Sequence, residues 1–295
     1  MDGILNINKP EGITSFGVVA KVKRTTKEKR VGHAGTLDPL ATGVLPVCLG
    51  KATRVIEYIH DGIKTYRAEI EMGISTTTYD REGEVTLRGN TSRIDRAGFE
   101  TVLAQFSGEI QQTPPIYSAL KHNGKPLYEL ARAHIEVELE SRPVTIYKLE
   151  VVGWQPPIVT IKVSCSKGTY IRSLANDIGQ ALGCGAYMKS LVRLNYGIFD
   201  INDAISLPQL ENAFNDGSWR QYLYPIDSVL SHLEQITLTD DEVSEVKYGR
   251  SLVLNNNSEK TGLSRARAYS RDGIFLAILD FKPEEGKWKP EKVFI

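Results

Sequence analysis

The stretch Gly32-His33-Ala34-Gly35-Thr36-Leu37-Asp38-Pro39-Leu40-Ala41-Thr42-Gly43 holds a single carboxylate in a loop rich in glycine. Asp38 is the only acidic residue between Glu28 and Glu57, and the other charges nearby are basic. Cations favour the ionised form of an acid, and an ionised carboxylate in a sheltered pocket can act as a nucleophile. Alternatively, Asp38 caps a helix that begins at Pro39. The stretch by itself leaves both interpretations open.

Length and composition predict a soluble globular protein. The chain has 295 residues, 41% of them apolar and 24% charged, so one large domain plus a small one is expected. No apolar stretch approaches the ~20 residues of a membrane span, and the N-terminal segment lacks the features of a signal peptide. Cys48, Cys165 and Cys184 have no metal-binding spacing and form no disulfide framework. We therefore expect a cytoplasmic protein without membrane association.

Charged residues are segregated along the chain, although the formal net charge is zero. Residues 21–30 and 162–193 are strongly basic, and much of the compensating acid lies in residues 200–245. This separation predicts a basic surface that meets a polyanion. Helix faces that are basic and simply solvated are the alternative.

The spacing of apolar residues predicts an α+β fold. Alternation or apolar runs indicate strands at 4–8, 44–49, 66–74, 143–153 and 158–165, with another near 135–139. Helical spacing follows Thr14, Asp95 and Thr169. Because strands and helices do not alternate regularly, a doubly wound sheet is not expected. A boundary near residue 230 separates a large domain, 1–230, from a small β-barrel of short strands, 231–295.

The motifs of several common enzyme classes are missing from the sequence. It has no zinc-deaminase signature, no HExxH, no P-loop and no serine nucleophile elbow, which leaves carboxylate chemistry. Arg172 falls in the first turn of the helix after Thr169, where the helix dipole disfavours a cation. An anionic partner such as Asp38 would offset that cost. Otherwise, Arg172 extends to solvent.

Three ring side chains are candidates for contact with a nucleic-acid base. Tyr66 opens a strand on its apolar face, so it is either a core residue or an aromatic that stacks on a flipped base. His33 is either a turn residue bonded to the backbone or a side chain that inserts into nucleic acid. Tyr170, beside Arg172, either packs in the core or lines the same pocket.

In combination, these motifs resemble the TruB-type tRNA pseudouridine-55 synthases over nearly the whole chain. Asp38 stands at the place of that family's nucleophile, Tyr66 at its active-site tyrosine and Arg172 at the basic partner of the aspartate. The matching segments are Gly3–Ser15, Gly32–Pro46, Lys64–Ala68, Pro114–Lys121, Gly124–Tyr128, Lys167–Leu174 and, less specifically, about Leu238–Phe294.

The resemblance implies a pseudouridine-synthase fold, with a central mixed, mostly antiparallel sheet flanked by helices. A catalytic domain at 1–230 would carry an RNA-gripping insertion near 115–142, and 231–295 would be a PUA-like RNA-binding β-barrel. The implied reaction is isomerisation of one uridine in the T-loop of tRNA to pseudouridine, with base flipping. It implies no cofactor, no metal and no obligate protein partner, and we expect a monomer.

The resemblance also implies a role for each candidate residue. Asp38 is the nucleophile, and Arg172 pairs with it and lowers its pKa. Tyr66 stacks on the flipped uracil and is a candidate to move a proton. His33 fills the space that the flipped base leaves. Tyr170 and Leu191 close the pocket.

Two departures from the family pattern and two rival functions accompany this interpretation. Thr77 replaces an acid found in many relatives, and Val192 stands where some carry a second arginine. A non-catalytic RNA-binding or RNA-chaperone protein would have lost the Asp38–Arg172 pair, which is intact. A carboxylate glycosidase generally needs two catalytic acids, and no second isolated acid accompanies Asp38.

Overall fold

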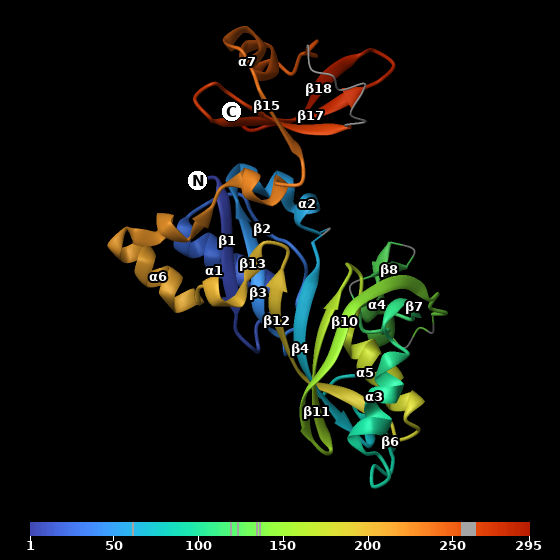
Figure 1. Cartoon of the computed structure of the whole chain (residues 1–295). Helices are drawn as coiled ribbons and strands as arrows, with labels where there is room; N and C mark the ends of the chain where they lie inside the picture. Colours follow the sequence, from blue (N-terminus) through green and yellow to red (C-terminus); the bar gives the residue numbers. More distant parts are fainter. Residues whose placement is uncertain (61, 119, 123, 134, 136, 255–263) are drawn as a thin grey trace.

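A mixed sheet of ten strands organises the larger part of the molecule (Figure 1). The computed structural model describes residues 1–60, 62–118, 120–122, 124–133, 135, 137–254 and 264–295. Strand pairs in this sheet are antiparallel except β3 with β12, which confirms the predicted mixed, mostly antiparallel sheet. In spatial order the strands are β14 (Leu223–Tyr224), β1 (Gly3–Lys9), β3 (Thr42–Leu49), β12 (Ala186–Tyr196), β4 (Lys64–Met72), β11 (Ile158–Cys165), β10 (Arg142–Gln155) and β7 (Gly108–Gln112), with β2 (Val31–His33) beside β3 and β13 (Phe199–Asp200) beside β12.

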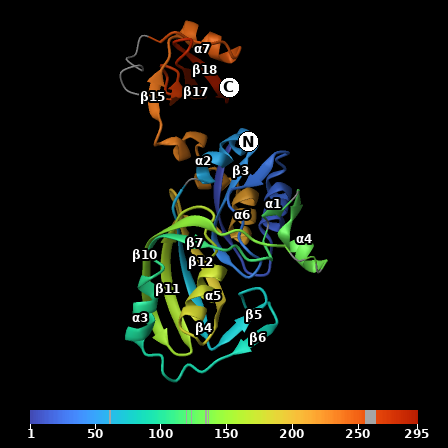
Figure 2. The same cartoon turned by 90° about the vertical axis from the view of Figure 1, so that its right-hand side faces the viewer.

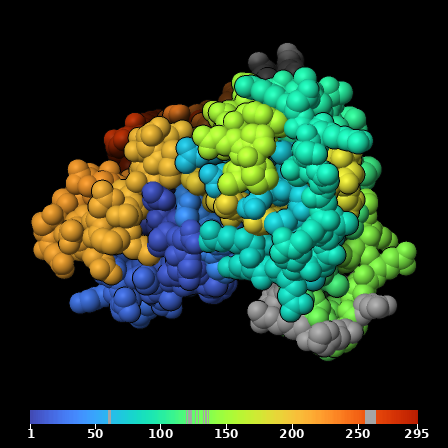
Figure 3. Space-filling model, turned by 90° about the horizontal axis from the view of Figure 1, so that it is seen from below, coloured from blue at the N-terminus to red at the C-terminus, as the bar shows by residue number. Residues whose placement is uncertain are grey.

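Helices pack separately on the two halves of this sheet (Figures 1 and 2). α1 (Ser15–Thr26) and α6 (Leu207–Asp216) belong to the β1–β3 half, and α5 (Ile171–Ala181) and α3 (Arg96–Ala104) to the β4–β10 half. Seen from below, the orange α6 region and the teal β6–α3 region lie at opposite ends (Figure 3). The short elements are η1 (Gly50–Val55), α2 (Ile56–His60), β5 (Ile74–Thr76), β6 (Val85–Arg88), β8 (Lys121–His122), β9 (Lys125–Pro126), α4 (Leu127–Arg132), η2 (Ile201–Asp203) and η3 (Ser218–Tyr222).

Each half of the sheet has its own apolar core, to which one helix contributes a row of buried apolar side chains. On α1, Val18 and Val22 are fully buried against Leu5 and Leu45. On α5, Leu174, Ala175 and Ile178 are fully buried in a second core built on β4, β11 and β12. The parallel contact of β3 with β12 joins the two halves.

The C-terminal part has a small sheet and a core of its own. β15 (Glu234–Thr237), β16 (Arg265–Tyr269), β17 (Phe275–Lys282) and β18 (Lys287–Val293) form a four-stranded sheet covered by α7 (Asp240–Lys247). The described residues leave this sheet open, so they do not show the closed barrel expected at 231–295. Residues 251–254 contribute to this sheet only the isolated bridge of Leu252 with Trp288.

One other expectation, the strand near 135–139, is wrong, and so is the alternative of a helix that begins at Pro39. Residues 135 and 137–139 form no strand, and the side chain of Ile135 is exposed instead of buried in an apolar core. Residues 134 and 136 lie outside the described part. Pro39 does not begin a helix. Asp38 instead begins a single turn, in which the Ala41 amide donates to the Asp38 carbonyl at 3.0 Å. Asp38 therefore caps no helix.

No helix in the described ranges is both long and apolar enough to cross a membrane.

Candidate active site

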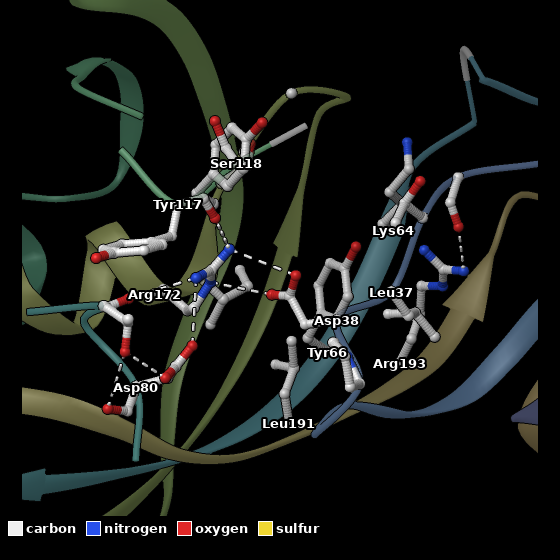
Figure 4. A pocket seen from close by; sticks show the side chains of 18 of the residues that line it. Leu37, Asp38, Lys64, Tyr66, Asp80, Tyr117, Ser118, Arg172, Leu191 and Arg193 are labelled. Carbon is white, nitrogen blue, oxygen red and sulfur yellow. Dashed lines mark hydrogen bonds and ion pairs between the residues drawn. The ribbon is translucent and has the colours of Figure 1, made fainter. Parts of the chain in front are cut away.

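A cavity of about 890 Å³ lies between the loop that joins β2 to β3, the strands β4 and β12, and the N-terminus of α5. Its lining includes Asp38, Tyr66, Tyr170, Arg172 and Leu191. The fold therefore brings five of the six predicted site residues to one cavity, although their segments are far apart in the sequence. Figure 4 shows the cavity from close by, with Arg172 between the carboxylates of Asp38 and Asp80.

Arg172 and Asp38 form a forked ion pair. Arg172 Nε lies 3.0 Å from Asp38 Oδ2, and its Nη2 donates to Asp38 Oδ1 at 3.4 Å. The Arg172 side chain is 7% exposed and that of Asp38 is 35% exposed. The aspartate is thus held from behind while its carboxylate faces the cavity, and Arg172 does not extend to solvent.

A second carboxylate, Asp80, holds the other side of the Arg172 guanidinium. Arg172 Nη1 lies 3.2 Å from Asp80 Oδ2, and Asp80 accepts from Thr78 Oγ1 at 2.6 Å and from the Glu82 amide at 3.0 Å. Arg172 also donates to the carbonyls of Thr78 and Tyr117. Each guanidinium nitrogen has an acceptor, which fixes the orientation in which Arg172 meets Asp38.

Asp80 is a site residue that was not predicted from the sequence, although Thr77 in the same turn was noted as a departure from the family pattern. The available signal was a carboxylate followed by glycine at Gly83, a turn composition. That pattern does not reveal that the carboxylate is 3% exposed and faces an arginine 92 residues away.

The pKa of Asp38 is shifted in the opposite direction from the expectation that pairing with Arg172 lowers it. Burial raises the pKa of Asp38 above the ordinary 3.8, and the nearby Asp80 raises it further. Arg172 and Lys9 lower it, but by less than burial raises it. The net direction is upward because the carboxylate sits against apolar walls and a like charge as well as an arginine.

Tyr66, Leu191 and Arg193 are brought together by the register of β4 and β12. Tyr66 lies directly opposite Arg193, and Ala68 opposite Leu191, so these side chains share one face of the sheet. Tyr66 is 6% exposed, and burial raises the pKa of its hydroxyl, so the phenol is neutral. Arg193 is 1% exposed and donates to the carbonyls of Val44 and Gly35 at 2.6 and 3.0 Å.

Two buried side chains, Lys9 and Ser15, hold the backbone of the Asp38 loop by hydrogen bonds. The buried Lys9 Nζ donates to the carbonyls of Pro10, Ile13 and Pro39. Ser15 Oγ donates to the Leu37 carbonyl and accepts from the Leu37 amide. The loop is therefore tied to the end of β1 and the start of α1 rather than free to move as a surface loop.

Of the two remaining predicted residues, Tyr170 lines the cavity and His33 does not. Tyr170 is half-buried just before α5. The side chain of Gln112 donates to the Tyr170 carbonyl and accepts from the Tyr170 amide. His33 lies at the end of β2 and is not among the residues that line the cavity. Its ring instead meets that of Phe16 edge to face, with centroids 5.8 Å apart.

The basic segments separate into surface and interior groups. In the segment 21–30, every lysine and arginine is exposed. In the segment 162–193, Arg172 and Arg193 are buried, and Lys162 and Lys167 are exposed. The second segment is therefore not a uniform basic surface, because its arginines build the site from inside. Among the described residues no cluster of His, Cys, Asp and Glu is suited to hold a metal ion.

Comparison with known proteins gives one consistent family. Residues 23–171 match the TruB family pseudouridylate synthase (N terminal domain), and residues 172–231 match the tRNA pseudouridylate synthase B C-terminal domain. Over 296 residues the chain is 48% identical to the tRNA pseudouridine synthase B of Dehalococcoides mccartyi, covering 100% of this chain and 97% of the relative. The protein of the same name from Clostridium kluyveri is 46% identical over 279 residues, covering 94% and 95%.

A solved structure shares the fold at lower identity. A chain in an H/ACA ribonucleoprotein bound to a substrate RNA containing 2′-deoxyuridine is 26% identical, with a TM-score of 0.73. The match covers 99% of this chain and 85% of that one. On the strength of the family match and of the full-length relatives, the chain belongs to the TruB family of pseudouridylate synthases, as its motifs predict.

Proposed function

We propose that this protein isomerises uridine 55 in the T-loop of tRNA to pseudouridine, with Asp38 as the nucleophile. The observation that carries the proposal is the half-buried carboxylate of Asp38, fixed by the buried Arg172 at 3.0 Å and facing a cavity of about 890 Å³. The relatives named tRNA pseudouridine synthase B support tRNA as the substrate.

The reaction replaces the bond from the sugar to a uracil nitrogen with one to a uracil carbon. No atom is exchanged with another molecule except protons: the new carbon centre loses one and the freed nitrogen gains one. Asp38 has to be ionised to act as a nucleophile while the uracil is detached from the sugar. The positive charge of Arg172 favours the ionised form of Asp38. The product can form only if the uracil turns in place, so the walls around Asp38 must confine it.

Both aromatic and aliphatic side chains of the pocket wall hold the uracil in place. Tyr66, as a neutral phenol, stacks on the flipped uracil, and Leu191 and Tyr170 confine it. His33 occupies the position that the uridine leaves in the T-loop. A splayed loop suits this arrangement because proteins read RNA best through unstacked bases.

The other parts of the molecule bind the RNA around this site. Residues 1–230 form the catalytic domain, and the insertion near 115–142 grips the RNA. Residues 231–295 are a PUA-like RNA-binding module. The basic segment 21–30 contacts phosphates, which makes affinity fall as salt rises. The enzyme works in the cytoplasm as a monomer without an obligate protein partner.

The decisive experiment is incubation with an unmodified tRNA transcript, followed by carbodiimide mapping of pseudouridine. We expect one modified uridine in the T-loop, and none with Asp38→Asn, which keeps tRNA binding but lacks a nucleophilic oxygen anion. Comparable turnover by Asp38→Asn would overturn the assignment of the nucleophile. Modification elsewhere in the tRNA, or none by the unaltered protein, would overturn the assigned substrate position.

A further inference from the structure

Phe16 is the most exposed large apolar side chain among the described residues. It is 77% exposed at the start of α1, whereas the three valines of that helix are buried. Its ring contacts His33 edge to face, at 5.8 Å and 89°. An exposed phenylalanine that already holds a second ring is poised to receive a third flat group.

Phe16 is held beside the active site. The preceding residue, Ser15, is 2% exposed and bonds both the amide and the carbonyl of Leu37 at 2.9 and 3.1 Å. Thr14, which lines the cavity, caps α1 by accepting from the Gly17 amide at 2.9 Å. The backbone of Phe16 is therefore fixed, because the preceding Ser15 is bonded to Leu37, the residue before Asp38. Only the ring of Phe16 is exposed to a ligand.

Positive charge continues outward from Phe16 along the same helix. Residues four and seven positions on share a face with Phe16, and they are Ala20 and Lys23, both exposed. Lys27, also exposed, follows directly after the helix ends at Thr26. A small residue and then two cations thus follow the ring away from the cavity. This order fits a ligand with a flat base near the active site and phosphates leading away from it.

We propose that Phe16 and His33 form a stacking site for an unpaired base that flanks the target uridine. The site rests on the proposed function, since it needs an RNA whose target base has left the stack. Flipping leaves a neighbouring base with one bare face, and an aromatic ring at the cavity rim covers that face. A protein partner on Phe16 is the alternative that the experiment tests.

The test uses a T-arm stem-loop RNA with 2-aminopurine at either nucleotide next to the target. The proteins carry Asp38→Asn, so that the RNA binds without turnover, and either Phe16, Phe16→Leu or Phe16→Tyr. Leucine keeps the apolar volume without the ring, and tyrosine keeps the ring. We expect fluorescence quenching on binding with Phe16 and with Phe16→Tyr. With Phe16→Leu we expect the quenching to be lost and Kd to rise about fivefold or more.

The controls separate stacking from other causes. Tyr147→Leu changes another exposed ring, on β10, and should leave both readouts unchanged. Equal quenching and equal Kd for Phe16 and Phe16→Leu would overturn the stacking site. An equal loss of binding to a fully paired RNA would overturn it too, because no bare base is present there. If the protein without substitutions modifies tRNA while the stacking test fails, the proposed function stands and only this inference falls.

Discussion

At the scale of single residues, the site depends on one guanidinium that meets two carboxylates. Arg172 lies between Asp38 and Asp80 and is buried with the latter. A guanidinium presents its donors in one plane, which an ammonium cannot do. The orientation of Asp38, and not merely the presence of a positive charge behind it, is what this arrangement supplies.

Replacing the fork by a point charge tests that conclusion. We expect Arg172→Lys to lower the single-turnover rate constant on tRNA about tenfold to a hundredfold, because charge-assisted hydrogen bonds contribute roughly 1.5–3 kcal/mol each. The rate is measured by quench-flow with saturating enzyme, and tRNA affinity by filter binding. An unchanged rate would show that the geometry of Arg172 is irrelevant to the reaction.

The pH dependence follows from the raised pKa of Asp38. The reaction needs the ionised carboxylate, so activity should fall as pH falls through a pKa above the ordinary 3.8. The same shift makes Asp38 contribute less to stability as pH rises through that window, since the folded state binds the proton more tightly than the unfolded state.

The pH profile of kcat/KM, compared with that of Asp80→Asn, tests the cause of the shift. Asp80 is a like charge that raises the pKa of Asp38, so its removal should displace the acid limb to lower pH. An acid limb that stays in place or moves upward would show that the charge of Asp80 does not act on Asp38 in this way.

At the scale of elements, the parallel contact of β3 with β12 brings the Asp38 loop against the Tyr66 strand. Gly43 makes this contact possible. It lies opposite Arg193 with φ +101°, and a Cβ there would meet the Arg193 carbonyl oxygen at 2.3 Å. The backbone at Gly43 or at Arg193 would have to move to make room for this Cβ. Such a movement would disturb β12, which carries Leu191, and its neighbour β4, which carries Tyr66.

Gly43→Ala should therefore destabilise the fold by more than the backbone conformation alone explains. The matched control is Gly217→Ala, where φ is +82° and the space around the added Cβ is empty. We expect a loss of about 1 kcal/mol at Gly217 and of at least about 3 kcal/mol at Gly43. The free energies of unfolding are measured in urea. Equal losses would mean that the strands separate at little cost.

At the scale of the whole molecule, the C-terminal part is attached through β17 and through the residue that follows β18. Ile278 and Phe294 belong to the core that also holds Ile4, Val55 and Val229. Lys51 Nζ donates to the Phe294 carbonyl at 2.8 Å, and Arg54 lies over the Phe294 ring. This shared core indicates that the two parts unfold together.

Phe294→Ala should lower the free energy of unfolding by about 3 kcal/mol, the usual cost of removing a buried phenylalanine. Ile295→Ala is the control, since Ile295 is 42% exposed next to it, and should cost under about 1 kcal/mol. Calorimetry should also give a single transition for the unaltered protein. Two separate transitions, or equal costs for both variants, would show that the parts are not coupled through Phe294.

Local sequence was enough to predict β1, β3, β4, β10 and β11, the α1, α3 and α5 helices, and Asp38 as a carboxylate in a neutral and basic loop. It did not predict β7 or the central strand β12. The features that were predicted depend on apolar periodicity and on neighbours within a few residues. The alternative in which Asp38 caps a helix at Pro39 also rested on local sequence. It is wrong because tertiary contacts of Lys9 and Ser15 hold the loop in a turn instead. The small barrel was expected from strand spacing, but spacing does not tell which strand edges meet.

What the sequence by itself determined is the set of chemical groups and, through its motifs, the family. Only the tertiary structure decided how those groups act on one another. Asp38 and Arg172 are 134 residues apart, and Arg172 and Asp80 are 92 apart, so no local pattern records their distances. Burial then sets the sign of the Asp38 pKa shift, which the charges of its neighbours alone predict wrongly. Burial is a property of packed elements, and for that reason the sequence identifies the reactive carboxylate while the fold sets the direction in which its pKa is shifted.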